Sequence, residues 1–215
     1  MPTDHTYKPT KRLLAAHQHR GLKQNGVTLR VGPSHLDGAE ITTIAVFGSV
    51  VGNSVPSRKT GAMVQIYYLR TNINPQDAIH KGLDSSICGD CLLSWAQAEK
   101  GKACCYILPF QAPSRVFEQW EKGKYPYLDA LKPKQRQLVM NILASVPIRL
   151  GAHGDQDTLQ MLVGRKWTGY THRWREFPHL KQSLMASIDS IVEYQEAKAA
   201  GLQNLPSHQG SSHAR

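Results

Sequence analysis

The chain lacks any apolar run close to the roughly 20 residues that a membrane-spanning helix requires. Its most apolar stretches, ITTIAVFGSVVG (41–52) and LVMNILASVPIRLG (138–151), are short and interrupted by glycine, proline or polar residues. The first 20 residues contain no apolar segment of the kind that secretory signals carry. We therefore expect a cytoplasmic protein without a membrane partner, in which cysteine thiols stay reduced.

Acidic residues are scarce. The chain has 26 lysines and arginines against 16 aspartates and glutamates, so its formal net charge is +10. This balance favours a polyanionic partner, nucleic acid or a nucleotide first. The sequence contains no RNP motif, no C-C-H-H zinc-finger spacing and no clear helix-turn-helix. The charge therefore does not indicate how the protein would bind nucleic acid. A basic surface without a dedicated partner is the alternative.

Several common catalytic motifs are also missing. The sequence contains no G-x-S-x-G, no H-E-x-x-H and no G-x-G-x-x-G. Serine hydrolases, zincin proteases and dinucleotide-dependent oxidoreductases are therefore unsupported.

The 215 residues suffice for one large domain with loose ends. Residues 1–38 are polar and basic, and we expect a partly ordered N-terminal arm there. A single α/β domain is predicted over 39–202, with a cysteine metal-binding insertion near 84–110. A disordered polar tail is predicted over 203–215.

Hydrophobic periodicity indicates both strands and helices. Strands are predicted within 39–54, 61–73, 146–155, 167–174 and 184–190. Helices are predicted over 75–84, 112–126, 132–145, 157–166 and 191–202. The alternation from about residue 135 onward is typical of βα units, but the strands are too few for a closed eight-stranded barrel. The expected fold is α/β: a partial, TIM-barrel-like or open, mostly parallel sheet with flanking helices.

All four cysteines lie between residues 84 and 110. Cys88 and Cys91 form a C-x2-C pair, which lets two thiolates face one ion, and Gly89 supports the tight turn between them. Cys104 and Cys105 are adjacent and would point to opposite faces of an extended segment, so we expect only one of them to bind metal. Three sulfur ligands fit zinc with a fourth histidine or water ligand, or an iron–sulfur cluster with one free iron. Free thiols, or a redox disulfide at the C-x2-C, are the alternatives.

The segment IRLGAHGD (148–155) predicts a strand followed by a glycine-rich loop. Arg149 would lie inside an apolar strand, where a charge is costly unless it is paired or bound to a ligand. Asp155 is its natural partner, and His153 is a candidate metal ligand or general base. We therefore take Arg149, His153 and Asp155 as candidate catalytic residues. A structural Arg–Asp pair is the alternative.

Two further segments suggest substrate contacts. In WTGYTHRWR (167–175), strand alternation would put Tyr170, His172 and Trp174 on one face, where rings beside cations suit bases and phosphates. A core strand is the alternative. The loop GNSVPSRKTG (52–61) could hold an anion through backbone N–H groups and Lys59, although an ordinary polar loop has the same composition.

In combination, these motifs resemble an uncharacterised family of phage, plasmid and prophage proteins distantly similar to the phage gene product 88 proteins. The resemblance covers roughly residues 47–201. It rests on the order of the following residues: Gly52, Asn53, Lys59, Thr60, Gly61, Cys88, Cys91, Cys105, Tyr106, Arg149, Gly151, Gly154, Asp155, Thr168, Gly169, Tyr170, Thr171 and His172.

The resemblance implies that Cys105, rather than Cys104, joins Cys88 and Cys91 as a metal ligand. It also implies a partial barrel reminiscent of radical S-adenosylmethionine enzymes. The usual C-x3-C-x2-C of that superfamily is absent here, so its chemistry is not carried over. Similar proteins continue past the last helix into a segment with further cysteines, which raises the alternative of a truncated, inactive relative.

The family supplies no established activity. The sequence therefore predicts a phage- or mobile-element-type protein with a cysteine-bound zinc or iron–sulfur cluster, acting as a metal-dependent enzyme on nucleic acid or a nucleotide. The rival prediction is a non-catalytic nucleic-acid-binding protein whose zinc is structural.

Overall fold

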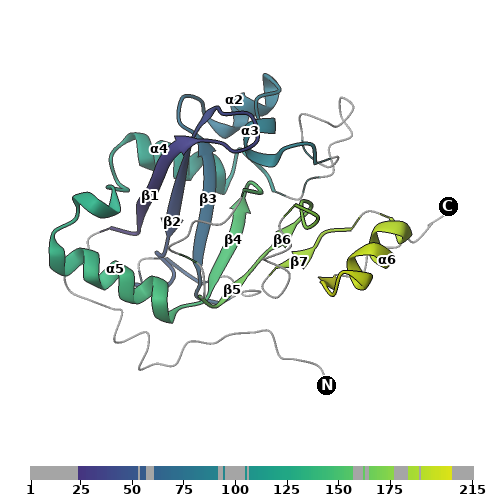
Figure 1. Ribbon diagram of the computed structural model, residues 1–215. Coiled ribbons are helices and arrows are strands. Elements are labelled where there is room, and N and C mark those ends of the chain that lie inside the picture. The colour runs from purple at the N-terminus through teal and green to yellow at the C-terminus, as the bar shows by residue number, and fades with distance from the viewer. Residues whose placement is uncertain are drawn as a thin grey trace, which may run out of the picture.

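The fold is built on two β-sheets, seen in the computed structural model in Figure 1. The structure describes residues 24–52, 54–56, 61–91, 94, 105, 107–156, 162, 165–176, 184–188 and 190–204. The larger sheet has the order β1-β2-β3-β4-β5, formed by Gly26–Pro33, Glu40–Val46, Val64–Arg70, Ile148–His153 and Trp167–Thr168. The smaller sheet has the order β6-β7-β8, formed by Tyr170–Thr171, Met185–Ala186 and Gln203–Asn204.

Proline residues and capping side chains mark the starts of most of the helices. The described helices are α2 (Pro75–His80), α3 (Ser85–Cys88), α4 (Ala112–Glu121), α5 (Pro133–Ser145) and α6 (Ile191–Ala199), with a 3-10 turn at Leu128–Ala130. Proline occupies the first turn of α2, α4 and α5, where its missing N–H costs nothing. The Asn74 and Ser190 side chains cap α2 and α6 by accepting main-chain N–H bonds.

The larger sheet lies between helices on its two faces. One core cluster joins Val64, Ile66 and Ile148 of the sheet to Val139 and Ile142 of α5. A second core cluster, on the opposite face, contains sheet and α4 residues: Ile44, Tyr67, Leu69, Val116 and Phe117. Successive β3 residues therefore alternate between an α5 face and an α4 face, as strand geometry requires.

The α/β class is confirmed, but a mostly parallel sheet is not. The β1–β2 and β2–β3 pairs are antiparallel, whereas β3–β4 and β4–β5 are parallel. The link between β1 and β2, residues 34–39, is too short for the crossover that a parallel pair needs. The long link from β3 to β4 carries α2 to α5, so that pair is parallel. The sheet is open and does not close into a barrel.

Gly169 carries the chain from the larger sheet into the smaller one. It lies between β5 and β6, and a Cβ there would stand 2.8 Å from the Leu150 carbonyl oxygen and 3.0 Å from Leu184 Cδ2. Its own carbonyl oxygen accepts a hydrogen bond of 3.0 Å from the Met185 N–H. The segment predicted as one strand over 167–174 therefore divides between two sheets at a residue that must lack a side chain.

Both ends of the described chain contain strands in segments predicted to be loose. β1 lies inside the predicted arm, and its Val27 and Thr28 side chains are fully buried. β8 lies at the start of the predicted tail and pairs with β7. No helix in the described parts of the chain is both long and apolar enough to cross a membrane.

Candidate functional site

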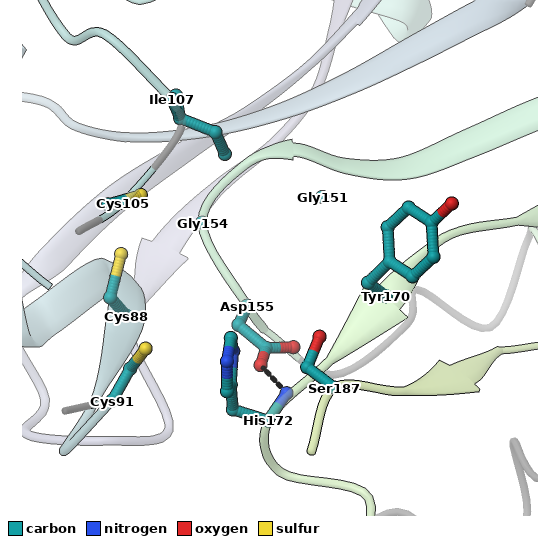
Figure 2. Close-up of a pocket in the computed structure, with 10 residues that line it drawn as sticks. All are labelled: Cys88, Cys91, Cys105, Ile107, Gly151, Gly154, Asp155, Tyr170, His172 and Ser187. Atoms are coloured by element: carbon teal, nitrogen blue, oxygen red, sulfur yellow. Dashed lines mark hydrogen bonds between the residues drawn. The ribbon is translucent and has the colours of Figure 1, made fainter. Parts of the chain in front are cut away.

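Residues from several separated parts of the sequence line one small cavity (Figure 2). Its volume is about 70 Å³, and it lies beside α3, the loop after β4, and the end of β6. It is lined by Cys88, Cys91, Cys105, Ile107, Gly151, Gly154, Asp155, Tyr170, His172 and Ser187. All of these except Ile107 and Ser187 belong to motifs that the sequence singles out.

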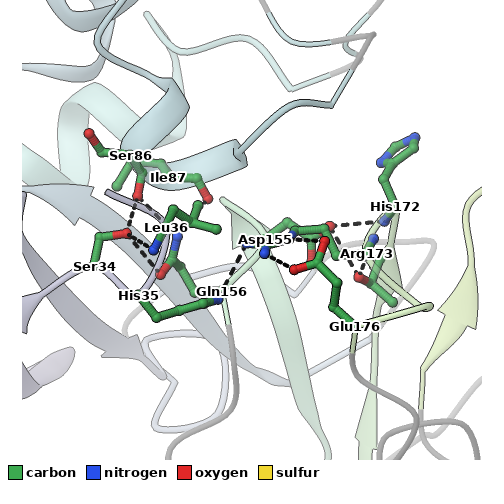
Figure 3. Close-up of polar contacts among 11 residues, drawn as sticks. Ser34, His35, Leu36, Ser86, Ile87, Asp155, Gln156, His172, Arg173 and Glu176 are labelled. Atoms are coloured by element: carbon green, nitrogen blue, oxygen red, sulfur yellow. Dashed lines mark hydrogen bonds and ion pairs between the residues drawn. The ribbon is translucent and has the colours of Figure 1, made fainter. Parts of the chain in front are cut away.

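Helix α3 places Cys88 on the cavity wall, and hydrogen bonds to two of its main-chain carbonyl oxygens hold it there. The Asp155 N–H donates to the Ile87 carbonyl oxygen at 3.0 Å. The Gln156 amide donates to the Ser86 and Ile87 carbonyl oxygens at 3.0 and 3.1 Å (Figure 3). The helix that ends in the first cysteine is therefore attached directly to the loop after β4.

The backbone of that loop depends on glycine. Gly154 has φ +87°, and a Cβ on it would lie 2.4 Å from Ile87 Cγ2. Gly151 has φ +59°, and the β3–β4 register shifts between the Gln65–Arg149 and Tyr67–His153 pairs. This bulge allows the chain to leave β4 toward α3.

Burial favours the neutral thiol forms of Cys88 and Cys105. It is the main cause that raises the pKa of Cys88 well above its ordinary value, and the nearby Asp84, Cys105, Cys91 and Asp155 groups raise it further. Burial also raises the pKa of Cys105. The cavity thus gathers several acidic groups, of which Asp155 has a pKa that burial raises and that the nearby His172 and Arg173 charges lower. A bound cation would favour the charged, metal-binding forms of these groups.

The Asp155 carboxylate connects the loop after β4 to the segment that follows β6. Its Oδ2 accepts hydrogen bonds from the Thr171 hydroxyl at 3.1 Å and from the His172 main-chain N–H at 2.9 Å. Burial raises the pKa of the Asp155 carboxyl, and these two bonds oppose the rise. Because Asp155 fixes the backbone of His172, the imidazole extends from a defined position on the wall of the cavity that the cysteines also line (Figure 2).

The three candidate catalytic residues do not share this cavity. Arg149 lines a separate groove on the α4 face, whereas Asp155 has the partners described above. His153 is buried, and its Nδ1 lies 2.9 Å from the Tyr68 carbonyl oxygen. The predicted Arg149–Asp155 pair is therefore not formed among the described residues, because the bulge at Gly151 changes which face the following residues occupy.

The predicted substrate row is also divided. Tyr170, which is 38% exposed, and His172 line the cavity. Trp174 is 4% exposed and packs in the small core beneath α6, with the Arg175 guanidinium 4.0 Å from its ring. The extended conformation ends at Thr171, whose hydroxyl accepts from the Arg173 N–H, and the chain then turns. Lys59 and Cys104 lie outside the described residues.

The three cysteines bring soft donors to one cavity, which suits zinc or an iron–sulfur cluster. Within the described ranges, no three histidine, cysteine, aspartate or glutamate side chains stand close enough to share one ion as placed. The donor chemistry therefore fits a metal, while the observed spacing is wider than coordination requires.

Sequence reasoning missed three residues that shape this region. Ile107 and Ser187 line the cavity but belong to apolar or small-residue segments without a distinctive pattern. Gln156 anchors α3 from a position about 70 residues away in the chain, and no local pattern signals such a contact.

Comparisons with protein-family models, with curated proteins and with solved structures found no match.

Proposed function

We propose that this is a phage- or mobile-element-type protein that binds zinc or an iron–sulfur cluster through Cys88, Cys91 and Cys105 and acts as a metal-dependent enzyme on nucleic acid or a nucleotide. One observation carries the proposal. The three sulfur-bearing residues line the same cavity as Asp155, His172 and Tyr170, although the two groups are far apart in sequence. In the cytoplasm expected for the protein, the thiols would stay reduced and available.

The metal would supply Lewis-acid chemistry or, as a cluster, electron transfer. The chain's own residues would position the substrate. Asp155 fixes the Thr171 hydroxyl and the His172 backbone, and His172 presents a ring nitrogen for binding or proton transfer. The partly exposed Tyr170 ring offers a surface on which a base can stack.

The cavity volume limits what can enter. About 70 Å³ holds an ion and a small group, and it is well below the usual size of a site for a whole small-molecule ligand. The substrate would therefore insert only its reacting end and lie largely outside, where the surplus positive charge of the chain favours a polyanion.

Metal analysis of anaerobically purified protein tests this proposal. We expect stoichiometric metal in the wild type and in Cys104→Ala, and its loss in Cys88→Ala, Cys91→Ala and Cys105→Ala. Metal retention should fall as the pH falls, because protons compete for the thiolates. A brown sample would identify a cluster, and a colourless one with one zinc would identify zinc. Full metal retention in Cys88→Ala and Cys105→Ala would overturn the ligand set.

The rival function, a nucleic-acid-binding protein with a structural zinc, is favoured by the net charge of +10. The cavity variants Asp155→Asn and His172→Gln distinguish the proposed enzyme from this nucleic-acid-binding protein. If the zinc is only structural, both variants should keep wild-type, salt-dependent binding to DNA or RNA, with no reaction product from either the variants or the wild type.

A further inference from the structure

Arg149 lines a groove of about 220 Å³ on the α4 face of the larger sheet. Gln65 is its register partner on β3, and Tyr67 lies two residues further along the same strand. Both of these side chains line the groove, together with Ala112 at the first turn of α4. This groove and the cysteine cavity have only Ile107 in common among the described residues that line them.

The guanidinium of Arg149 lacks a counter-ion within the described part of the chain. No carboxylate of the described residues forms an ion pair with it, and none of the residues lining the groove is acidic. Arg149 is nevertheless only partly exposed, in a strand whose flanking residues Ile148 and Leu150 are buried. A half-buried cation in this position is costly unless an anion accompanies it.

The polar groups beside Arg149 are hydrogen-bond donors. The Tyr67 hydroxyl donates to Gln65 Oε1 at 3.1 Å, which leaves the Gln65 amide N–H groups for another acceptor. The N-terminus of α4 borders the same groove, and its cap residue Gln111 forms no side-chain capping bond. The positive end of this helix adds to the field of Arg149.

We propose that this groove binds an anionic group, a phosphate or a carboxylate, with Arg149 as its principal ligand. Both groups present paired oxygens that match the planar guanidinium fork, and both accept from the Gln65 amide. The inference does not depend on the proposed metal centre, because Cys88, Cys91 and Cys105 do not line the groove.

Thermal unfolding of the full chain at low ionic strength tests the proposal. The protein is titrated with inorganic phosphate and, in a separate arm at matched ionic strength, with acetate. A ligand that binds the folded state raises the unfolding midpoint in a saturable way. A response to phosphate alone, to acetate alone or to both supports the site and identifies the group that it accepts. The absence of a saturable response to either anion would overturn it.

Matched arginine variants separate this site from the overall basic charge. Arg149→Gln should weaken the apparent affinity about tenfold or more, because it removes a charge-assisted, bidentate donor. Arg149→Lys should keep the charge but lose the fork, so its affinity should fall between those of the wild type and Arg149→Gln. Arg115→Gln removes the same charge from an exposed position of α4 outside the groove, and its affinity should stay at the wild-type value.

The integrity of each variant is checked by its circular dichroism and its unfolding midpoint without anion. Arg149→Gln should fold normally, because it removes a partly buried charge that no described carboxylate pairs. An equal loss of affinity in Arg115→Gln and Arg149→Gln would show that the anion responds only to net charge, and the proposal would then fail.

Discussion

The main-chain N–H of Asp155 donates a hydrogen bond of 3.0 Å to the carbonyl oxygen of Ile87. This bond joins the loop after β4 to α3, the helix that ends at Cys88. Because it uses main-chain atoms only, it does not depend on either side chain. The relative position of the first cysteine and of Asp155 is therefore set by the main chain rather than by either side chain.

Gln156→Ala should lower the free energy of unfolding by about 1–3 kcal/mol. The substitution removes two buried hydrogen bonds to the Ser86 and Ile87 carbonyl oxygens. Gln137→Ala, on the exposed side of α5, is the control and should change stability by less than about 0.5 kcal/mol. Urea unfolding measures both variants, and equal stability for the two would show that the Gln156 bonds do not anchor α3.

Gly154→Ala should destabilise the protein by about 2–5 kcal/mol, because it combines a left-handed backbone with a clash against Ile87. Gly38→Ala separates these two effects. Gly38 has a similar φ of +77°, but a Cβ added there would meet nothing within 4 Å, so only the backbone cost of about 1–2 kcal/mol applies. The difference between the two variants in urea unfolding measures the closeness of the loop to α3. A difference near zero would contradict the observed packing.

Local patterns predicted much of this fold. The Ile-, Val- and Thr-rich composition of β2, the strand predicted over 61–73 and the prolines at the starts of α2 and α5 correspond to the observed elements. β1 could not be predicted in the same way, since its buried Val27 and Thr28 are surrounded by a basic, polar sequence. β1 is stabilised by its pairing with β2, and the amino-acid composition of a segment does not reveal which strand it will pair with.

The candidate site was predictable as a set of motifs but not as a geometry. A period of two would give Arg149, Gly151 and His153 one common face of a strand. The bulge at Gly151 breaks that period, and Arg149 and Asp155 consequently contact different cavities. Backbone irregularities of this kind depend on tertiary contacts, here the packing of Gly154 against Ile87.

The stability of the protein should fall as the pH decreases from 7.5 to 5.5, in part because of His153. Burial lowers the pKa of His153 below its ordinary value of 6.5, and its Nδ1 is bonded to the Tyr68 carbonyl oxygen. Around pH 6.5 the unfolded chain therefore binds more protons at this site than the folded chain does. Acid favours unfolding until the pH falls below the folded-state pKa of His153. Urea unfolding across this range should show a weaker pH dependence for His153→Gln. His80→Gln, at an exposed position, should keep the wild-type slope, and identical slopes for all three proteins would contradict the assignment.

Arg149→Gln should raise the pKa of Tyr67. Burial already raises this pKa above the ordinary value of 10.0, and the nearby Arg149 charge opposes the rise by favouring the phenolate. Removing that charge leaves the effect of burial less opposed, whereas Arg149→Lys retains it. The pKa can be followed by NMR of ¹³C-labelled tyrosine rings, with Tyr67→Phe to assign the resonance and Arg115→Gln as the charge-matched control. If Arg115→Gln shifted the Tyr67 pKa as much as Arg149→Gln, the Arg149 guanidinium would not lie beside this hydroxyl, and the basis for an anion site in the groove would be lost.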